Sequence, residues 1–315
     1  MPACPRSSPE PPSSTPALQL AASDGEPLPA TRADPDRPLG HVLAPAIVPD
    51  QQSFESGIAN VARVYDYLLG GKDNFRADRE AGDRLLRAVP GVHVAARENR
   101  AFLGRAVRFL DEAGIHQFLD IGAGLPTARA VHEVVRGAVP PPRTVYVDND
   151  PVVLRHAEAL TGSEPGVAAV HADLRRMEDL LDYVTWRELI DLGQPVAILL
   201  VAVLHFVRDE ECPWAIVDIL KDRIAPGSYL VISHGTADHI SPEAAKRARD
   251  AYADASAPGV ARSLGQVARF FAGLQMVEPG LVPVSEWRPD HIGMPPEPVL
   301  FYAGIGRKTM PGRPR

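Results

Sequence analysis

The spacing of hydrophobic and polar residues along the chain changes at about residue 115. Before that point, apolar residues recur every three or four positions, as at Ile58, Val61, Tyr65 and Leu68, which is typical of amphipathic helices. The pattern predicts three helices between residues 53 and 114, the last one running from about Val92 to Ala113. This segment is predicted to be a helical cap that lies against the rest of the chain.

After residue 115, short apolar runs alternate with helical patterns. The predicted strands are Gln117–Ile121, Thr144–Val147, Val167–His171, Val196–Val201 and Ser228–Ser233. The helices between them are predicted at Pro126–Arg136, Pro151–Leu160, Met177–Leu189 and Cys212–Ile224, with further helical stretches at Pro242–Ala255 and Ser263–Gly273. Two late strands are predicted near Leu281–Ser285 and Val299–Ile305. Because the main strands are apolar without alternation, both faces of their sheet should be covered, which favours a parallel, doubly wound α/β fold.

The composition of the first 50 residues predicts an N-terminal tail outside the folded part of the chain. Twelve of the 32 prolines fall within the first 50 residues, so residues 1–52 are predicted to be a disordered, proline-rich segment. Residues 53–114 are assigned to the helical cap, residues 115–307 to the α/β core and residues 308–315 to a short C-terminal tail.

One stretch, HQFLDIGAGLPT, concentrates the candidate chemistry. Asp120 interrupts an apolar strand, Gly122 and Gly124 follow, and Pro126 with Thr127 opens a helix. Glycines allow a ligand to approach the backbone closely, and the start of a helix offers free N–H groups. A polar ligand is therefore expected at this turn.

Three acidic residues stand at comparable places, Asp120 in the first strand, Asp148 at the end of the second and Asp173 just after the third. The carboxyl ends of parallel strands converge on one crevice. There Asp148 could accept both ribose hydroxyls, Asp173 could reach an adenine amino group, and Asp120 could meet a cationic ligand tail. The alternative for each acid is a helix N-cap.

The ligand is expected to be S-adenosylmethionine rather than a dinucleotide. The third glycine of a dinucleotide fingerprint is replaced by Thr127, and a phosphate group would be repelled by Asp120. A nucleoside with a cationic sulfonium and an ammonium suits the same turn.

Longer motifs carry a family resemblance. LDIGAG, VDNDP and HADL resemble the first three motifs of class I S-adenosylmethionine-dependent methyltransferases. NVARVYDYLLGGKDNFRADRE, ENRAFLGRAVRFL, QFLDIGAGLPT, VYVDNDPVVL and LLVAVLHFV resemble the bacterial S-adenosyl methyltransferase family, whose substrate is largely undefined. The resemblance covers the chain from about Ile58 onward.

The resemblance implies a Rossmann-like, seven-stranded sheet with the last strand antiparallel. It implies cofactor contacts at Asp120, Gly122, Asp148, Asn149, Asp173 and Leu174. We add to the expected cofactor site Ala123 and Gly124 in the glycine turn, Val201 at the end of the fourth strand, and Arg97.

The residues that would bind the methyl acceptor are less clearly indicated by the sequence. After the fourth strand stands Val201-Ala202-Val203, not the Asn/Asp-Pro-Pro-aromatic turn of many amine methyltransferases, and no carboxylate appears before Asp209. His205 is the candidate catalytic base, since the ordinary pKa of histidine is near 6.5. The alternative is a partly buried histidine that binds a backbone carbonyl. His234 is a second candidate with the same alternative.

The cap supplies further candidates. Polar and aromatic residues gather beside Gly70-Gly71, namely Tyr65, Tyr67, Lys72, Asn74, Arg97, Asn99 and Arg100. They could form a lid over the cofactor, with Arg97 or Arg100 pairing with its methionine carboxylate. The alternative is an ordinary solvated helix face.

The charge and hydropathy of the chain limit the classes of partner that we expect for it. The net charge of −7 and the lack of a long basic run argue against a nucleic-acid partner. No apolar run is long enough to span a membrane and no secretory signal is seen, so a cytoplasmic location is expected. The two cysteines, Cys4 and Cys212, indicate no metal-ligand cluster.

The sequence therefore predicts a methyltransferase that acts on a small-molecule acceptor. Two alternatives remain open, a non-catalytic sensor of an adenosyl ligand and a nicotinamide-dependent oxidoreductase. Asp120 and Thr127 argue against the oxidoreductase.

Overall fold

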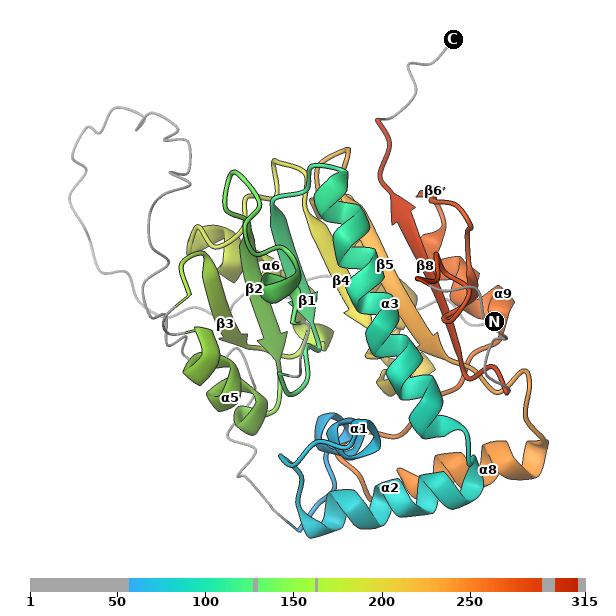
Figure 1. Cartoon of the computed structure of the whole chain (residues 1–315). Coiled ribbons are helices and arrows are strands. Elements are labelled where there is room, and N and C mark those ends of the chain that lie inside the picture. The colour runs from blue at the N-terminus through green and yellow to red at the C-terminus, as the bar shows by residue number, and fades with distance from the viewer. Residues whose placement is uncertain (1–56, 127–129, 162–163, 291–297, 311–315) are drawn as a thin grey trace, which may run out of the picture. The chain divides into compact units, whose positions relative to one another are not determined.

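The computed structural model describes residues 57–126, 130–161, 164–290 and 298–310 (Figure 1). The tail predicted over residues 1–52, Thr127 and most of the tail predicted over residues 308–315 lie outside the described residues. All the described residues belong to one compact unit of the chain, Pro35–Arg315.

Three helices precede the first strand, as predicted: α1 (Val61–Leu69), α2 (Arg76–Ala88) and α3 (Val92–Glu112). The side chain of Asn60 accepts hydrogen bonds from the first free N–H groups of α1, which satisfies donors that have no partner within the helix. Gly70 ends α1 in the left-handed conformation, with φ 83°, where glycine has no Cβ clash.

The strands follow the predicted order closely. They are β1 (Gln117–Ile121), β2 (Arg143–Asp148), β3 (Val167–His171), β4 (Ala197–Val201), β5 (Tyr229–Gly235), β6 (Gln275–Met276), β7 (Val282–Pro283) and β8 (Phe301–Arg307). Their order in the sheet is β3-β2-β1-β4-β5-β8-β6, with β7 also paired to β8. The neighbouring pairs among β1 to β5 are parallel, and β8 is antiparallel to β5, which confirms the predicted fold class.

The sheet differs from the expected seven strands at its edge. Two strands of two residues each, β6 and β7, both pair with β8, so the described sheet has eight strands. Between them the chain leaves the ladder in a turn, where the Gly280 N–H donates to the Val277 carbonyl at 2.8 Å. Gly280 has φ 91°, a conformation that a strand cannot continue through.

The helices after β1 are α4 (Val131–Val134), α5 (Pro151–Thr161), α6 (Met177–Trp186), α7 (Pro213–Arg223), α8 (Pro242–Ala251) and α9 (Leu264–Ala268). Short 3₁₀ turns lie at Leu174–Arg176, Leu204–Phe206, Asp209–Glu211 and Arg269–Phe271. Of the helix predicted at Pro126–Arg136, the described residues contain only α4. No helix within the described ranges combines the length and apolar character needed to cross a bilayer.

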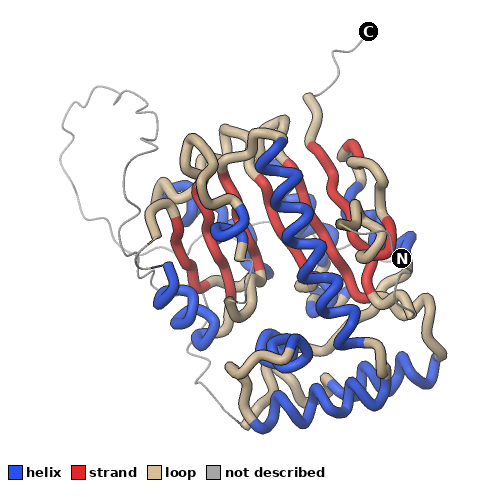
Figure 2. Tube along the Cα trace, in the orientation of Figure 1, coloured by secondary structure: helices blue, strands red, loops and turns tan. Residues whose placement is uncertain are grey.

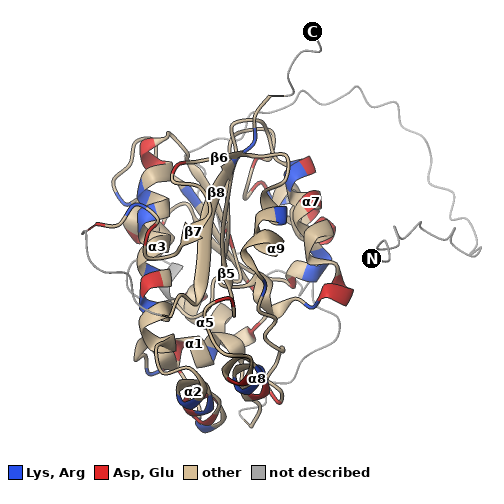
Figure 3. Cartoon of the chain, turned by 90° about the vertical axis from the view of Figure 1, so that its right-hand side faces the viewer, with Lys and Arg blue, Asp and Glu red and all other residues tan. Residues whose placement is uncertain are grey.

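Successive strand residues point to opposite faces of the sheet, and each face has its own hydrophobic core. Phe118 of β1 joins the cluster under α3, whereas Leu119 joins the cluster under α6 and α7. Figures 2 and 3 show the result: α3 lies on one side of the sheet, and α7 and α9 lie on the other. Covering both faces explains why the strands are apolar throughout.

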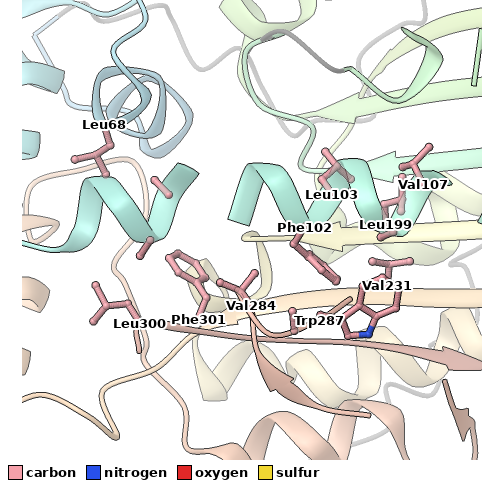
Figure 4. Packing of buried hydrophobic residues seen from close by; sticks show 14 of the residues in the cluster. Leu68, Phe102, Leu103, Val107, Leu199, Val231, Val284, Trp287, Leu300 and Phe301 are labelled. Carbon is pink, nitrogen blue, oxygen red and sulfur yellow. The ribbon is translucent and has the colours of Figure 1, made fainter. Parts of the chain in front are cut away.

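Helix α3 is the main bridge between the N-terminal helices and the sheet. Phe102 is fully buried, and its ring meets that of Trp287 edge to face at 5.4 Å (Figure 4). The buried Arg105 side chain donates to the carbonyls of Trp287 and Val284, both at 2.8 Å. The hydrophobic core therefore continues from α3 into the sheet without a break at residue 114.

Helices α1, α2 and α8 lie together at the carboxyl ends of the parallel strands, with α2 and α8 side by side (Figures 1 and 3). The segment after α8 is joined to the start of α1 by a hydrogen bond of 2.8 Å from the Ser256 N–H to the Ala59 carbonyl. Segments almost 200 residues apart in the sequence thus cover the same edge of the sheet.

Phe102→Ala should lower the free energy of unfolding by about 3–5 kcal/mol, because it removes a buried ring and leaves a cavity. Urea denaturation measures the change. Met310→Ala is the control, since Met310 is 75% exposed and its loss should have little effect. A loss below about 1 kcal/mol for Phe102→Ala would contradict the packing of α3 on the sheet.

Candidate functional site

A cleft lies at the carboxyl ends of the parallel strands, beneath α1 and α3. Its empty volume is about 1170 Å³, including the part open to solvent. The residues that follow β1, β2, β3 and β4 form one wall, and residues of α1, α3 and the segment after α8 form the other. In Figure 1 the arrows of β1 and β2 point toward α1, which places this edge of the sheet under the cap.

The glycine turn after β1 is shaped by close backbone contacts. The N–H groups of Gly122 and Ala123 donate to the Val147 carbonyl of β2 at 2.8 and 3.1 Å. Gly122 has φ 74°, and a Cβ there would lie 2.3 Å from a methyl carbon of Val203. Gly124 has φ 65° and faces more open space. The turn therefore requires glycine at position 122 for two independent reasons.

Asp148 ends β2 and is held by the backbone. Its carboxylate accepts hydrogen bonds from the N–H groups of Gly124 and Asp150, each at 2.9 Å. Burial raises the pKa of Asp148 to about 6, although these two bonds favour the ionised form. A carboxylate has further acceptor capacity beyond two bonds, which is available to hydroxyl groups in the cleft.

Asp120 lies in β1, next to the glycine turn, and is 4% exposed. Burial raises its pKa to about 7, the positive charge of Arg100 opposes this rise, and the negative charge of Asp148 adds to it. The carboxylate is thus only partly compensated by its surroundings. A cationic group entering the cleft would be favoured here.

Asp173 combines the two interpretations considered for it. Its carboxylate accepts a hydrogen bond from the Arg175 N–H at 2.9 Å and caps the turn at Leu174–Arg176, yet it also lines the cleft. The Arg175 guanidinium pairs with Asp173 at 2.8 Å and with Glu211 at 2.9 Å. Asp173 can therefore cap this turn and face a ligand in the cleft at the same time.

The helical wall presents a buried polar pair. Asn99 of α3 is 1% exposed, and its amide nitrogen donates to the Tyr65 hydroxyl at 2.9 Å. The Tyr65 hydroxyl donates in turn to the Ala96 carbonyl at 2.9 Å. Because this donation commits the hydroxyl proton, Tyr65 must accept from Asn99, which fixes the orientation of the amide. The Asn99 carbonyl oxygen is buried and has no hydrogen-bond partner among the described residues.

Most of the expected cofactor residues come together in this cleft. It is lined by Asp120, Gly122, Ala123, Gly124, Asp148, Asn149, Asp173, Leu174 and Val201. They come from four different strand ends, as the convergence of parallel strands requires. Arg97 and His205 are placed elsewhere.

Arg97 is exposed on α3, and Arg100 of the same helix lines the cleft instead. An offset of three residues rotates a side chain by about 60° around the helix axis. That rotation is sufficient to separate the cleft edge from solvent. Ala96, Asn99 and Leu103 are buried and mark the inward side of α3. Arg100 lies closer to this side than Arg97 does.

His205 lies behind the cleft wall, although the next residue, Phe206, lines the cleft. Its Nδ1 accepts a hydrogen bond from the Gly235 N–H at 3.3 Å, rather than binding a backbone carbonyl. Burial lowers the pKa of His205 well below the usual value, and His234 and Arg262 lower it further. The ring is neutral and packed, so its position does not favour the predicted role as a base.

His234 is fully enclosed behind the same wall. Its Nδ1 donates to the Gly235 carbonyl at 2.8 Å and its Nε2 accepts from the Arg262 guanidinium at 2.9 Å. Burial lowers the pKa of His234 to about 3. Arg262 also donates to the carbonyls of Leu204 and Val207, and thereby holds the loop that forms the wall.

Several residues that line the cleft are not among the site residues predicted from the sequence. They are Asn60, Val61, Ala62, Phe206, Val207, Ser256 and Ala257. The Ser256 hydroxyl accepts a hydrogen bond from the Val61 N–H at 3.3 Å, which closes the cleft between distant segments. Only the tertiary arrangement brings these residues together.

Comparison with known proteins identifies the family. The model of the S-adenosyl methyltransferase family matches residues 48–309. A crystal structure from Thermobifida fusca YX, described as that of a candidate methyltransferase, has 42% identity and a TM-score of 0.76, covering 81% of this chain and 96% of its own. A DUF574 family protein from Streptomyces avermitilis MA-4680 has 41% identity and a TM-score of 0.76, covering 80% and 98%.

The comparison with curated proteins gave no match. The family match nevertheless extends over most of the chain, including every strand of the sheet and the whole cleft. The chain belongs to the S-adenosyl methyltransferase family, with S-adenosylmethionine as its cofactor.

Proposed function

We propose that the protein transfers a methyl group from S-adenosylmethionine to a small, uncharged acceptor bound between the end of β4 and the helical cap. One observation carries this proposal. The charged residues that line the described cleft are Arg100, Asp120, Asp148, Asp173 and Arg175, and they lie at the strand ends of the cofactor motifs or beside Asp120. The remaining wall is neutral.

The residues at the strand ends fit the cofactor. Asp148 is proposed to accept the ribose hydroxyls, and Asp173 with Leu174 and Asn149 to surround the adenine. The incompletely compensated Asp120 suits the cationic half of the molecule. The cofactor, when bound, supplies an electrophilic methyl group on a sulfonium. Arg100, in place of Arg97, is proposed to pair with the methionine carboxylate.

The apolar part of the cleft, formed by residues of both walls, suits an uncharged acceptor. Leu103 from α3 and Val203, Phe206 and Val207 from the segment after β4 are apolar. An uncompensated charge placed against such a surface would lose its hydration without replacement. The buried carbonyl oxygen of Asn99 is proposed to accept a hydrogen bond from an N–H or O–H group of the acceptor.

Catalysis is proposed to rest on positioning rather than on a base. Tyr65 lines the acceptor side, but burial raises its pKa, so it stays protonated at neutral pH. Holding a nucleophile in line with its reaction partner can account for several kcal/mol of rate acceleration. The acceptor therefore reaches the cleft with its nucleophilic lone pair already available. A cytoplasmic location and the lack of a nucleic-acid partner stay predictions from the sequence.

The proposal is tested by incubating the protein with methyl-labelled S-adenosylmethionine and a metabolite extract. Mass spectrometry should detect a small labelled product. This product is uncharged if the methylated acceptor has lost a proton, and is a cation if it has not. Tight cofactor binding without any labelled product would favour the non-catalytic sensor instead.

Asp148→Asn should weaken S-adenosylmethionine binding by about 10- to 100-fold, because hydrogen bonds to an ionised group contribute about 1.5–3 kcal/mol. Isothermal titration calorimetry at pH 8 measures the dissociation constant. Asp179→Asn is the control, since Asp179 lies on the surface of α6 and pairs only with Arg176 within the described chain. An unchanged affinity for Asp148→Asn would sink the ribose assignment.

Asp120→Asn should stabilise the ligand-free protein at pH 8 while weakening cofactor binding. The folded-state pKa of Asp120 is raised from 3.8 to about 7, so the folded state binds this proton more tightly than the unfolded state does. This group therefore lowers the free energy of unfolding as the pH rises toward 7. Removing it should give the variant an advantage that widens by about 2–3 kcal/mol between pH 5 and pH 8.

Urea denaturation of both proteins at pH 5, 6, 7 and 8 measures this difference. If Asp120→Asn were less stable than the wild type at pH 8, the carboxylate would be well compensated and its proposed complementarity to a cation would be wrong.

His205 should not titrate between pH 5.5 and 8.5, because burial keeps its ring neutral. NMR spectra of protein labelled at histidine carbons measure the titration, and His205→Gln assigns the signal. An inflection for His205 near pH 6.5 would restore it as a candidate base.

A further inference from the structure

Arg63 of α1 lies between the cap and the turn that follows β2. It is 4% exposed, and its guanidinium pairs with two acids at once. Nε donates to Asp78 at 2.9 Å and Nη1 donates to Asp150 at 2.9 Å. The side chains of both acids are almost fully buried, at 0% and 2% exposure. Water screens such pairs little, so their charges act strongly on neighbouring groups.

Within the cap, Asp78 binds the residues that precede helices α1 and α2. Its carboxylate accepts hydrogen bonds from the N–H groups of Asn60 and Phe75, both at 2.8 Å. Asn60 caps α1 and lines the cleft, and Phe75 precedes α2. Arg63 is therefore fixed within the cap.

On the cofactor side, Asp150 contacts the ribose acid directly. Its N–H donates to Asp148 at 2.9 Å, and its own carboxylate accepts from the Val152 N–H at 2.8 Å at the start of α5. Two motifs of the family resemblance, NVARVYDYLLGGKDNFRADRE and VYVDNDPVVL, meet in this cluster.

We propose that Arg63 is a positioning residue for Asp148. Arg63 neutralises Asp150 and joins the ribose-binding turn to the cap. The inference rests on the proposed role of Asp148 in ribose binding. It gives α1 a function beyond covering the cleft.

The charges around Asp148 set the direction in which its pKa should change when Arg63 is removed. The negative charge of Asp150 raises the pKa of Asp148, and the cation of Arg63 lies against that charge. Without Arg63, Asp148 would face an uncompensated buried acid and would take up a proton at a higher pH. The other titratable or charged groups near Asp148 are Asp120 on β1, His171 on β3 and, beyond Asp120, Arg100 on α3. They are unchanged by substitutions at positions 63 and 150.

The test measures binding of 5′-methylthioadenosine by calorimetry between pH 5.5 and 8.5. This probe contains the adenine and the ribose but lacks both the sulfonium and the amino-acid tail, so it does not depend on a charge at Asp120. Its affinity should be lost as Asp148 becomes protonated.

Arg63→Met should raise the midpoint of this loss by about one to two pH units, which gives a roughly two- to tenfold weaker affinity at pH 7 and recovery at pH 8.5. Asp150→Asn should lower the midpoint, since asparagine removes the like charge and remains a good helix N-cap. Arg76→Met is the matched control, because Arg76 is an exposed cap arginine that pairs with Glu80. Its midpoint should equal that of the wild type.

A merely structural role predicts a different result. In that case Arg63→Met and Asp150→Asn would both weaken binding without opposite shifts of the midpoint, and the inference would be overturned. Arg63→Lys keeps the charge and should keep the midpoint even where it lowers the melting temperature. If Arg63→Met does not fold, the downward shift in Asp150→Asn and the unshifted Arg63→Lys carry the test.

Asp148→Asn distinguishes a failure of the ribose assignment from a failure of the role proposed for Arg63. Unchanged probe binding in this variant would refute the ribose assignment itself. Lost binding in Asp148→Asn, together with a wild-type midpoint in Arg63→Met, would refute only the role of Arg63.

Discussion

The carboxylates of Asp120, which is buried, and Asp148, which is half-buried, lie on adjacent parallel strands and are the constraint on which the rest of the site depends. The register of β1 on β2 pairs Asp120 with Tyr146 and Ile121 with Val147, so Asp148 follows directly beside the glycine turn. Burial raises both pKa values, to about 7 for Asp120 and about 6 for Asp148, and the negative charge of Asp148 adds to the rise at Asp120. The fold limits this cost with the N–H groups of Gly124 and Asp150 and leaves the remainder to be relieved by a ligand.

The cleft has two halves of different origin. The strand-end half is built from local strand-to-helix turns, in which a few consecutive residues set the geometry. The helical half is built from tertiary contacts, such as the hydrogen bonds of Ser256 with Ala59 and Val61. This division matches the proposed division of labour, because the cofactor is shared by the family whereas the acceptor depends on the surface that the distant segments create.

The same division explains what could be predicted from the sequence. Strands β1 and β3 have the predicted bounds, and the acids at strand ends were found because a buried strand rarely tolerates charge. Strand β7 lies within the strand predicted near Leu281–Ser285, whereas β6 has no predicted counterpart, since two residues give no periodicity. The predictions that differ from the structure are tertiary: helix phase places Arg100, not Arg97, at the cleft, and the loop after β4 turns His205 behind the wall that Phe206 completes.

The proposed division also locates the origin of pH dependence. The described acceptor wall presents no group that titrates near neutrality, because Tyr65 has a raised pKa and His205 stands behind the wall with a lowered one. The groups that do titrate there, Asp120 and Asp148, belong to the cofactor side. A loss of activity toward acid pH would then reflect weaker cofactor binding and enter through the KM for the cofactor, whereas the ionisation of the free acceptor would enter through kcat/KM for the acceptor. The pH profile at saturating cofactor thus reports the pKa of the nucleophile, which makes the reaction a probe of the acceptor's chemistry.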